Sequence, residues 1–253
     1  MFVSVSTRCF ASESLESALR HIAELEFNKI ELAILEDGPH LRPSEIAADP
    51  EHALHRIRSG PSLTASAFDL DFGQVDEKTY VKRFEAMCRF AKPLTVAVLT
   101  IPASSRETSL NAEIRRVSVL NEIALREGLV LTLETHSQTL TGDPANALAL
   151  CKALPGLGLT IDPSHYIIQN QKKGVDELYA YARNVHLRDT GREPGQFQVL
   201  IGQGEIEYNR VVTLLERHGY DRSLTVSVLD LPDNPFDNEA EVRKLKLLLE
   251  SLV

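Results

Sequence analysis

The chain has 253 residues, of which 43% are hydrophobic, so it is long and apolar enough to bury a sizeable core. Its 36 acidic and 27 basic residues give a formal net charge of −9. This charge argues against a nucleic-acid binder, because such binding depends on clustered Lys and Arg. No apolar run reaches about eighteen residues, so we expect no membrane span.

The amino-terminal stretch MFVSVSTRCF has no basic region followed by an apolar stretch, so we expect no secretion signal. Cys9, Cys88 and Cys151 are odd in number and widely separated, and no CxxC pair occurs. These features predict neither a disulfide framework nor a cysteine zinc site, and they favour a cytoplasmic location.

Short runs rich in Val, Ile, Leu or Thr predict eight β-strands. In chain order they are FVSVS (2–6), KIELAI (29–34), LTASAF (63–68), TVAVLTI (95–101), LVLTLET (129–135), LGLTID (157–162), NVHLRD (184–189) and LTVSVL (224–229).

Amphipathic segments separate these runs. Leu15, Ala18, Leu19, Ile22 and Leu25 recur at three- and four-residue intervals, which is typical of one face of a helix. Similar helices are predicted for 110–128, which stops at a glycine, for 143–156, which starts with Asp-Pro, and for 237–253.

Strand–helix units spaced roughly 27 to 40 residues apart favour a parallel sheet with crossover helices. A doubly wound sheet is the competing layout, but the first turn, STRCFASES, lacks the glycine-rich GxGxxG pattern. The number of units and the length predict an α/β fold, a single (β/α)8 TIM barrel, with residues 1–253 as one domain.

Polar residues gather where three successive strands end. The fifth run ends in LETH, which places Glu134 and His136 on the same side of the pleat. The sixth ends in IDPSH, with Asp162 and His165, and the seventh in VHLRD, where His186 and Arg188 are in phase. Barrel enzymes carry their chemistry at this end of the strands, so we expect these side chains to share one rim.

Carboxylate and imidazole groups from neighbouring strands form a mixed oxygen–nitrogen site for a divalent cation. Mn²⁺ or Mg²⁺ suits the carboxylates, and Zn²⁺ or Co²⁺ also fits this mixture of ligands. Taken alone, DPSH is also consistent with a turn and a structural histidine, because Asp before Pro commonly starts a turn. The recurrence at three strand ends favours a site.

The segments LETH, IDPSHY, VHLRD and GQGEIEYNRVVTLLERHGYDRSLTVSV together resemble the xylose-isomerase-like TIM barrel superfamily. This group contains sugar-phosphate isomerases and epimerases, among them ketose 3-epimerases, inosose isomerases and related dehydratases. The layout agrees over the whole chain, and the motifs agree over about residues 129–230. The resemblance implies metal ligation by Glu134, Asp162 and His186, with Glu134 also a catalytic acid/base. It further implies substrate contacts by His165 and Arg192, and we expect the same of His136 and Arg188.

One position departs from the family pattern, which ends strand eight with a glutamate that is both metal ligand and second base. Ser227 stands there in this chain, and a hydroxyl is a weak ligand and a poor base. Asp230 and Glu205 are the candidate replacements. Asp230 follows by three residues, which is the wrong parity for the same strand face.

The resemblance implies an enzyme that removes a proton beside a metal-polarised carbonyl and returns it through an enediolate. Epimerisation normally needs two acid/base groups, whereas isomerisation proceeds with one. The sequence therefore favours a divalent-metal-dependent sugar isomerase/epimerase-like enzyme, with a lyase as a variant and Glu134 as base. We expect a small sugar or polyol-ketone substrate, and association into homo-oligomers. The loop DTGREPGQ offers Arg192 as its one cation, which favours a substrate without phosphate.

Two other hypotheses remain. Ser227 supports a barrel that lost catalysis and serves as a ligand-binding or regulatory protein. An endonuclease-like relative needs more metal ligands and a basic face, which an acidic chain does not provide.

Overall fold

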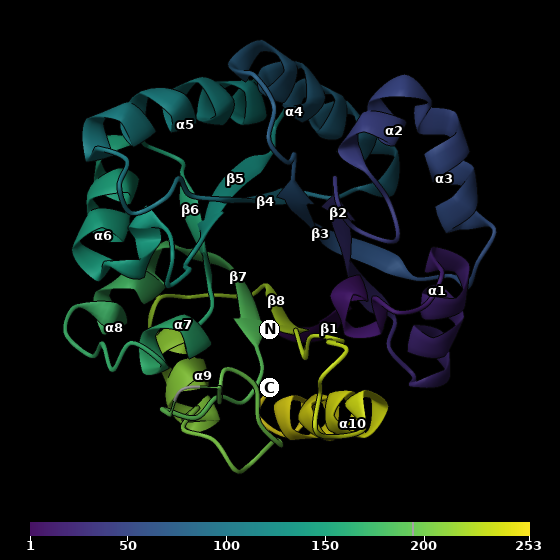
Figure 1. Cartoon of the computed structure of the whole chain (residues 1–253), viewed down its shortest axis with the longest axis vertical. Coiled ribbons are helices and arrows are strands. Elements are labelled where there is room, and N and C mark those ends of the chain that lie inside the picture. The colour runs from purple at the N-terminus through teal and green to yellow at the C-terminus, as the bar shows by residue number, and fades with distance from the viewer. Residues whose placement is uncertain (194) are drawn as a thin grey trace.

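The strands form a closed parallel barrel, as predicted (Figure 1). The computed structural model describes residues 1–193 and 195–253. Within these residues, each strand pairs with its neighbour in sequence, and β8 returns to pair with β1. The strands are β1 (Phe2–Ser6), β2 (Lys29–Leu35), β3 (Thr64–Asp71), β4 (Val98–Pro102), β5 (Val130–Glu134), β6 (Gly158–Ile161), β7 (Ala182–Leu187) and β8 (Ser223–Val226). All eight predicted runs are confirmed, with bounds that shift by a few residues.

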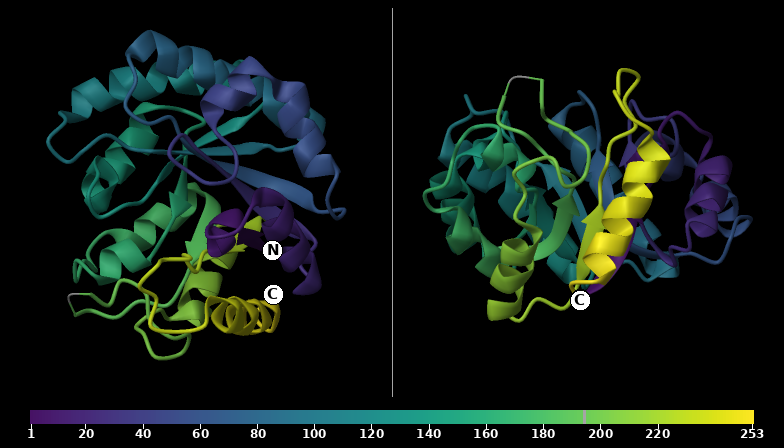
Figure 2. Two further views of the ribbon diagram at one scale, coloured as in Figure 1. Left: turned by 45° about the vertical axis from the view of Figure 1, so that its right-hand side comes forward. Right: turned by 90° about the horizontal axis from the view of Figure 1, so that it is seen from below.

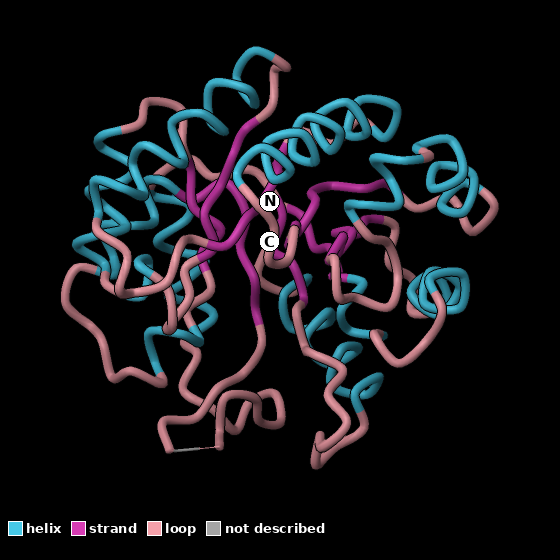
Figure 3. Tube along the Cα trace, turned by 45° about the horizontal axis from the view of Figure 1, so that its top comes forward, coloured by secondary structure: helices cyan, strands magenta, loops and turns pink. Residues whose placement is uncertain are grey.

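Helices surround the barrel, and Figure 3 shows the strands gathered inside this outer layer. The α-helices are α1 (Leu15–Glu24), α2 (Pro43–Ala48), α3 (Pro50–Arg58), α4 (Glu77–Ala91), α5 (Leu110–Arg126), α6 (Pro144–Ala153), α7 (Ser164–Ile167), α8 (Val175–Leu178), α9 (Tyr208–Arg217) and α10 (Asn238–Glu250). Four short 3₁₀ helices lie in the described chain: Thr7–Phe10, Lys92–Leu94, Leu140–Gly142 and Tyr179–Tyr181.

Local sequence sets the ends of these helices. The side chain of Ser14 accepts the backbone N–H of Ser17 at the start of α1, and Asp143 caps α6 in the same way, just before a proline at the first helical position. Helix α5 stops where Gly128 adopts a φ of +73°, a left-handed conformation that glycine takes at little cost.

Outward-facing strand residues make the main hydrophobic core with the helices. In β2, Ile30, Leu32 and Ile34 are at most 1% exposed and alternate with residues that point into the barrel. The same alternation holds in β5, where Leu131 and Leu133 are fully buried. Burial of this apolar layer is the main driving force that holds helices against strands.

The barrel interior is polar, although most barrels of this type fill it with branched apolar side chains. The hydroxyls of Thr100 and Thr132 each lie 2.8 Å from that of Thr160. On the opposite wall, the Ser4 hydroxyl lies 2.5 Å from that of Ser223 and 3.0 Å from that of Thr225. Mutual hydrogen bonding lets these groups lie buried, each bond contributing about 1 kcal/mol.

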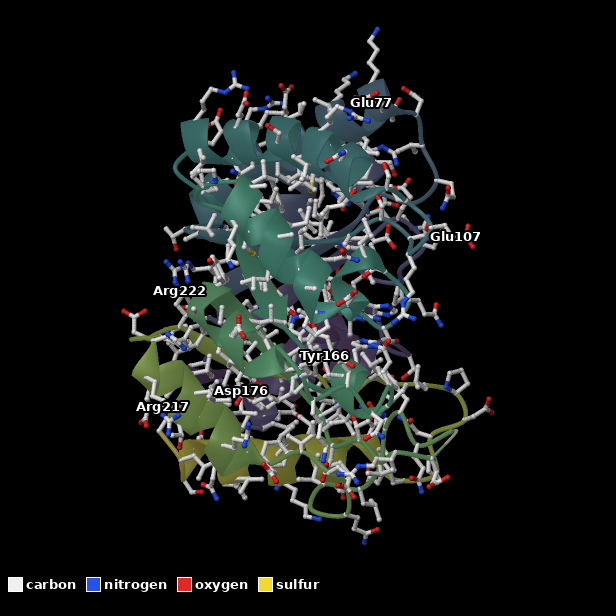
Figure 4. All side chains as sticks on the ribbon, turned by 90° about the vertical axis from the view of Figure 1, so that its left-hand side faces the viewer. Glu77, Glu107, Tyr166, Asp176, Arg217 and Arg222 are labelled. Atoms are coloured by element: carbon white, nitrogen blue, oxygen red, sulfur yellow. The ribbon has the colours of Figure 1, made fainter. Side chains whose placement is uncertain are left out.

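The last helix closes the ring beside the first strand. Helix α10 packs against β1 and β8, so both chain ends lie on this side of the barrel (Figure 2). In Figure 4, Arg222 lies before β8 and Glu107 after β4, so the two labels mark opposite ends of the barrel. Over 1–193 and 195–253, no helix is both long and apolar enough to cross a membrane.

Candidate metal centre

Three of the sequence-predicted residues meet at the carboxyl-terminal rim of the barrel. Glu134 ends β5, Asp162 follows β6, and His186 lies near the end of β7. One ligand atom from each lies within 4.8 Å of the others. The side chain of Asp162 is fully buried, that of His186 is 1% exposed and that of Glu134 is 13% exposed. Their role as metal ligands stays a prediction.

His186 bridges two carboxylates. Its Nε2 lies 2.9 Å from Glu31 Oε2, and its Nδ1 lies 3.2 Å from Glu134 Oε1. A neutral imidazole carries one N–H, so it can donate to only one of the two. For both contacts to be favourable, His186 or one of the two carboxyl groups must carry a further proton, or Nδ1 and Glu134 must both be ligands of a cation.

The charges in this group depend strongly on one another. Burial by itself would lower the pKa of His186, but Glu31 and Glu134 raise it well above its ordinary value. Burial would likewise raise the pKa of Glu134, but the hydrogen bond and charge of His186 hold it below its ordinary value. Glu134 is therefore a carboxylate at neutral pH, as both a ligand and a general base require.

Asp162 is held by groups on both of its oxygens. The backbone N–H and the hydroxyl of Ser164 donate to Oδ1, at 3.0 and 2.5 Å. Oδ2 lies 2.8 Å from Nη1 of Arg188, yet it accepts no well-aligned hydrogen bond from any residue the structure describes. The ion pair offsets the cost of burying the carboxylate and leaves Oδ2 a lone pair for an ion.

Arg188 contacts Ser227, the residue at which the sequence departs from the family resemblance. Its Nε donates to the backbone oxygen of Ser227 at 2.8 Å, and its Nη2 donates to the hydroxyl at 3.2 Å. The guanidinium lies over the ring of Phe197, 4.8 Å from its centre, and the residue is 2% exposed. A cation thus lies directly beside the Ser227 hydroxyl.

Histidines form one wall of the rim. The rings of His136 and His165 pack with centroids 4.0 Å apart at an interplanar angle of 43°, and Phe197 also packs against His165, with centroids 4.9 Å apart. Burial lowers the pKa of His165 to about 4, so this ring is neutral at neutral pH. His165 Nδ1 lies 3.1 Å from the Ser137 hydroxyl.

Three other residues singled out in the sequence have partners elsewhere. Arg192 Nη2 lies 2.7 Å from Glu205 Oε2, in an ion pair in which both side chains are nearly half exposed. Asp230 Oδ2 accepts the backbone N–H and the hydroxyl of Ser12, at 2.8 and 2.5 Å. Neither Glu205 nor Asp230 belongs to the ligand cluster found in the described chain.

Sequence reasoning missed Glu31, Asp69 and Arg8, which line the interior beside the cluster. Burial raises the pKa of Asp69 to about 6 even though Arg8 Nη1 lies 3.3 Å from its Oδ2. Glu31 and Asp69 could have been identified from the sequence, because each is a charged residue in an apolar strand at a position whose side chain points into the barrel. Arg8 lies in a 3₁₀ helix and carries no such signal.

A pocket at the barrel mouth lies next to Arg8. Its lining combines the Arg8 side chain with three carboxylates: Asp71 at the end of β3, and Asp37 and Asp230 from the loops after β2 and β8. The pocket therefore offers many hydrogen-bond acceptors and few cations.

The chain belongs to the xylose isomerase-like TIM barrel family, whose model matches residues 19–250. Among the solved structures that share its fold are an epimerase-like protein, a zinc-bound protein and a probable dehydratase. The D-tagatose 3-epimerase-like protein is 21% identical (TM-score 0.76; 100% of this chain and 98% of that chain). The IOLI protein with a bound zinc atom is 18% identical, with a TM-score of 0.75 over 100% of this chain and 98% of that chain. The probable 3-DHS dehydratase AsbF from Bacillus anthracis is 15% identical, with a TM-score of 0.75 over 99% of both chains. No curated protein matched.

Proposed function

We propose that this protein is a divalent-metal-dependent isomerase or lyase that acts on a small polyhydroxylated carbonyl compound. The observation that carries the proposal is the convergence of Glu134, Asp162 and His186 from three strands at one rim, with ligand atoms within 4.8 Å of one another. Catalytic groups lie at this rim in barrel enzymes. The epimerase-like and dehydratase structures with the same fold support the same class of chemistry.

The donor set fits a divalent ion. Nδ1 of His186 and the carboxylate of Glu134 would both hold the cation, whose charge would take the place of a shared proton. Asp162 Oδ2 would supply the third ligand. The zinc-bound structure with this fold supports Zn²⁺, and Mn²⁺, Mg²⁺ and Co²⁺ suit the same donors. When bound, such an ion polarises a substrate carbonyl and stabilises negative charge on its oxygen.

Glu134 is the proposed base. Its side chain is the most exposed of the three, at 13%, so it is the most accessible to a substrate that enters from solvent. It is charged at neutral pH and can take the proton from the carbon beside the carbonyl, leaving an enediolate. The same carboxyl can return that proton to the neighbouring carbon. Transfer of the adjacent hydroxyl proton to the oxyanion then completes an isomerisation, with the carbonyl moved by one carbon.

Reaction with one base fits this site better than epimerisation with two. Ser227 has no basic group, and its hydroxyl accepts a hydrogen bond from Arg188. The strand-eight side therefore presents a fixed cation, which cannot deliver or accept a proton near neutral pH. We accordingly favour an aldose–ketose isomerase or a lyase over a two-base epimerase.

The mouth pocket favours a neutral substrate. The carboxylates of Asp37, Asp71 and Asp230 would repel a phosphate, whereas they accept hydrogen bonds from hydroxyl groups. His136 and His165 lie on the facing wall and are proposed to contact the same substrate. Arg192 is paired on the surface with Glu205, so its substrate contact would require that ion pair to open.

The proposal is tested by metal analysis and by proton exchange. Purified protein should contain about one divalent ion per chain. Ketoses, inososes and keto-acids in D₂O should then exchange the proton beside the carbonyl only when the ion is present. Stoichiometric metal without exchange in the panel would contradict the proposed catalysis.

Arg188 and Ser227 favour a second candidate, a ligand-binding or regulatory barrel without catalysis. Arg188 already neutralises Asp162 at 2.8 Å, which reduces the need for a metal there. Protein that binds sugars tightly but takes up no divalent ion would support this second function.

A further inference from the structure

We propose that Glu31 is a positioning residue that fixes His186 with Nδ1 toward the metal position. The inference rests on the proposed function, because it concerns the ion that Glu134, Asp162 and His186 would hold. Glu31 lies in the middle of β2, on the far side of His186 from Glu134.

The geometry gives Glu31 two donors on one oxygen. Asn184 Nδ2 donates to Oε2 at 2.6 Å, and His186 Nε2 lies 2.9 Å from the same atom. Both Glu31 and His186 are at most 1% exposed, so water does not compete for these contacts. Asn184 in turn accepts a hydrogen bond from the Thr225 hydroxyl at 3.2 Å, which fixes the orientation of its amide.

The second oxygen of Glu31 points to a function beyond packing. Oε1 is buried and has no hydrogen-bond partner among the residues the structure describes. A carboxylate that only stabilised the fold would be expected to have both oxygens paired, since each buried unpaired oxygen is costly. The hydrogen bonds of Glu31 in the described chain thus all fall on the oxygen that faces Asn184 and His186.

The contact with Glu31 fixes one tautomer of the His186 ring. Nε2 of His186 keeps its proton for Glu31, so Nδ1 supplies the lone pair that faces Glu134 and Asp162. A carboxylate behind a histidine ligand orients the ring and raises its basicity, and its loss typically costs 10–100-fold in metal affinity, as an order of magnitude. Glu31 would thus control affinity without touching the ion.

The test compares Glu31→Gln with a matched control, Glu113→Gln. Glu113 is as fully buried as Glu31, but it binds Ser104 and Arg116 outside the barrel interior. Zn²⁺ affinity is measured for both variants and the wild type by competition with a chelator, and cooperative thermal unfolding shows that each is folded. Glu31→Gln should bind Zn²⁺ about tenfold more weakly, and Glu113→Gln should match the wild type. Equal affinity for all three proteins would overturn the inference.

A second measurement needs no variant and covers the case in which Glu31→Gln fails to fold. In ¹⁵N-histidine-labelled wild type loaded with Zn²⁺, two-bond ¹H–¹⁵N correlations should show Nε2 of His186 protonated and Nδ1 metal-bound. The reverse assignment would overturn the inference and leave the proposed function standing. Wild type that takes up neither Zn²⁺ nor Mn²⁺, Mg²⁺ or Co²⁺ would overturn both.

Discussion

The guanidinium of Arg188 holds Ser227 by two hydrogen bonds, from Nε to the backbone oxygen at 2.8 Å and from Nη2 to the hydroxyl at 3.2 Å. The same group lies 2.8 Å from Asp162. One arginine thus links the residues that follow β6, β7 and β8, at the position where this sequence departs from the family resemblance. The first two predictions follow from this contact.

Ser227→Ala removes the hydroxyl that accepts a hydrogen bond from Arg188, but it removes no acid/base group. The free energy of unfolding should fall by about 1 kcal/mol, because the bond to the backbone oxygen remains. Urea denaturation measures this change, and exchange of the substrate proton in D₂O should stay close to the wild-type rate. A loss of exchange of about a hundredfold would show instead that the hydroxyl takes part in the chemistry.

Arg188→Met leaves Asp162 buried without a cation. Metal-free protein should lose about 3–5 kcal/mol of stability, as when one partner of a buried ion pair is removed. Added Zn²⁺ should restore more stability to this variant than to the wild type, because the ion takes over the neutralisation of Asp162. Thermal unfolding with and without Zn²⁺ measures both effects.

Arg192→Gln is the matched control for Arg188→Met. Its ion pair with Glu205 is nearly half exposed, so its loss should cost about 0–1 kcal/mol. If Zn²⁺ raised the melting temperatures of both variants and the wild type equally, Arg188 would have no influence on the metal position.

Glu134→Gln should abolish turnover. An amide cannot accept the proton, and general-base catalysis contributes about 10²–10⁴-fold. Deuterium exchange measures the rate, and circular dichroism checks that the barrel is intact. Glu205→Gln, an exposed carboxylate outside the cluster, serves as the control. Wild-type exchange rates in Glu134→Gln would rule out this residue as the base.

His21 predicts a pH-dependent link between α1 and α10. Its Nδ1 lies 2.8 Å from Glu13 and its Nε2 lies 3.0 Å from Glu239. Although burial would lower the pKa of His21, these two carboxylates raise it above its ordinary value. The ion pairs therefore contribute stability that is full below the unfolded pKa, about 6.5, and is lost as the pH rises through the raised folded value.

The pH-dependent contribution of His21 to stability is modest, because its side chain is about a quarter exposed. We expect His21→Gln to cost about 0.5 kcal/mol more at pH 5.5 than at pH 8.5, measured by urea denaturation at both values. The ring also packs on Phe10, with centroids 4.6 Å apart, which adds a loss that does not depend on pH. An equal loss at both pH values would mean that the ion pairs contribute nothing measurable.

Much of this fold could be predicted because its signals are local. The eight strands are short apolar runs, and the rim residues Glu134, Asp162 and His186 follow directly from where those runs end. The polar interior could not be predicted in the same way. Thr100, Thr132 and Thr160 favour strands through their branched side chains, whichever face they occupy, so their hydroxyl cluster emerges only when the barrel closes.

The missed part of the site depends on contacts that are distant in sequence. Glu31 meets His186 across 155 positions, and Arg188 meets Ser227 across 39. The departure at Ser227 is visible in the sequence, but the group that fills the resulting space is not. Periodicity finds which face a side chain is on, and it does not find the partner across the barrel.

The Asp189 carboxylate binds several backbone N–H groups of the long loop between β7 and α9. Its replacement should therefore make that loop less ordered. Its carboxylate accepts backbone N–H groups at four positions, with distances between 2.7 and 3.4 Å: Thr190, Gly202, Gly204 and Ile206. The residue is 1% exposed, so these groups have no water to replace it. Asp189→Asn turns one acceptor oxygen into a donor that faces other donors.

We expect this variant to lose about 3 kcal/mol of stability, since hydrogen bonds to a charged acceptor contribute about 1.5–3 kcal/mol each and some will be retained. Hydrogen exchange should speed up in the loop before it does so in the strands. Phe197 belongs to this loop and covers both Arg188 and His165, so a looser loop also exposes the rim to water. Asp176→Asn, at an exposed ion pair with Arg210, is the control. Unchanged loop exchange in Asp189→Asn would show that apolar contacts, and not this carboxylate, hold the loop over the site.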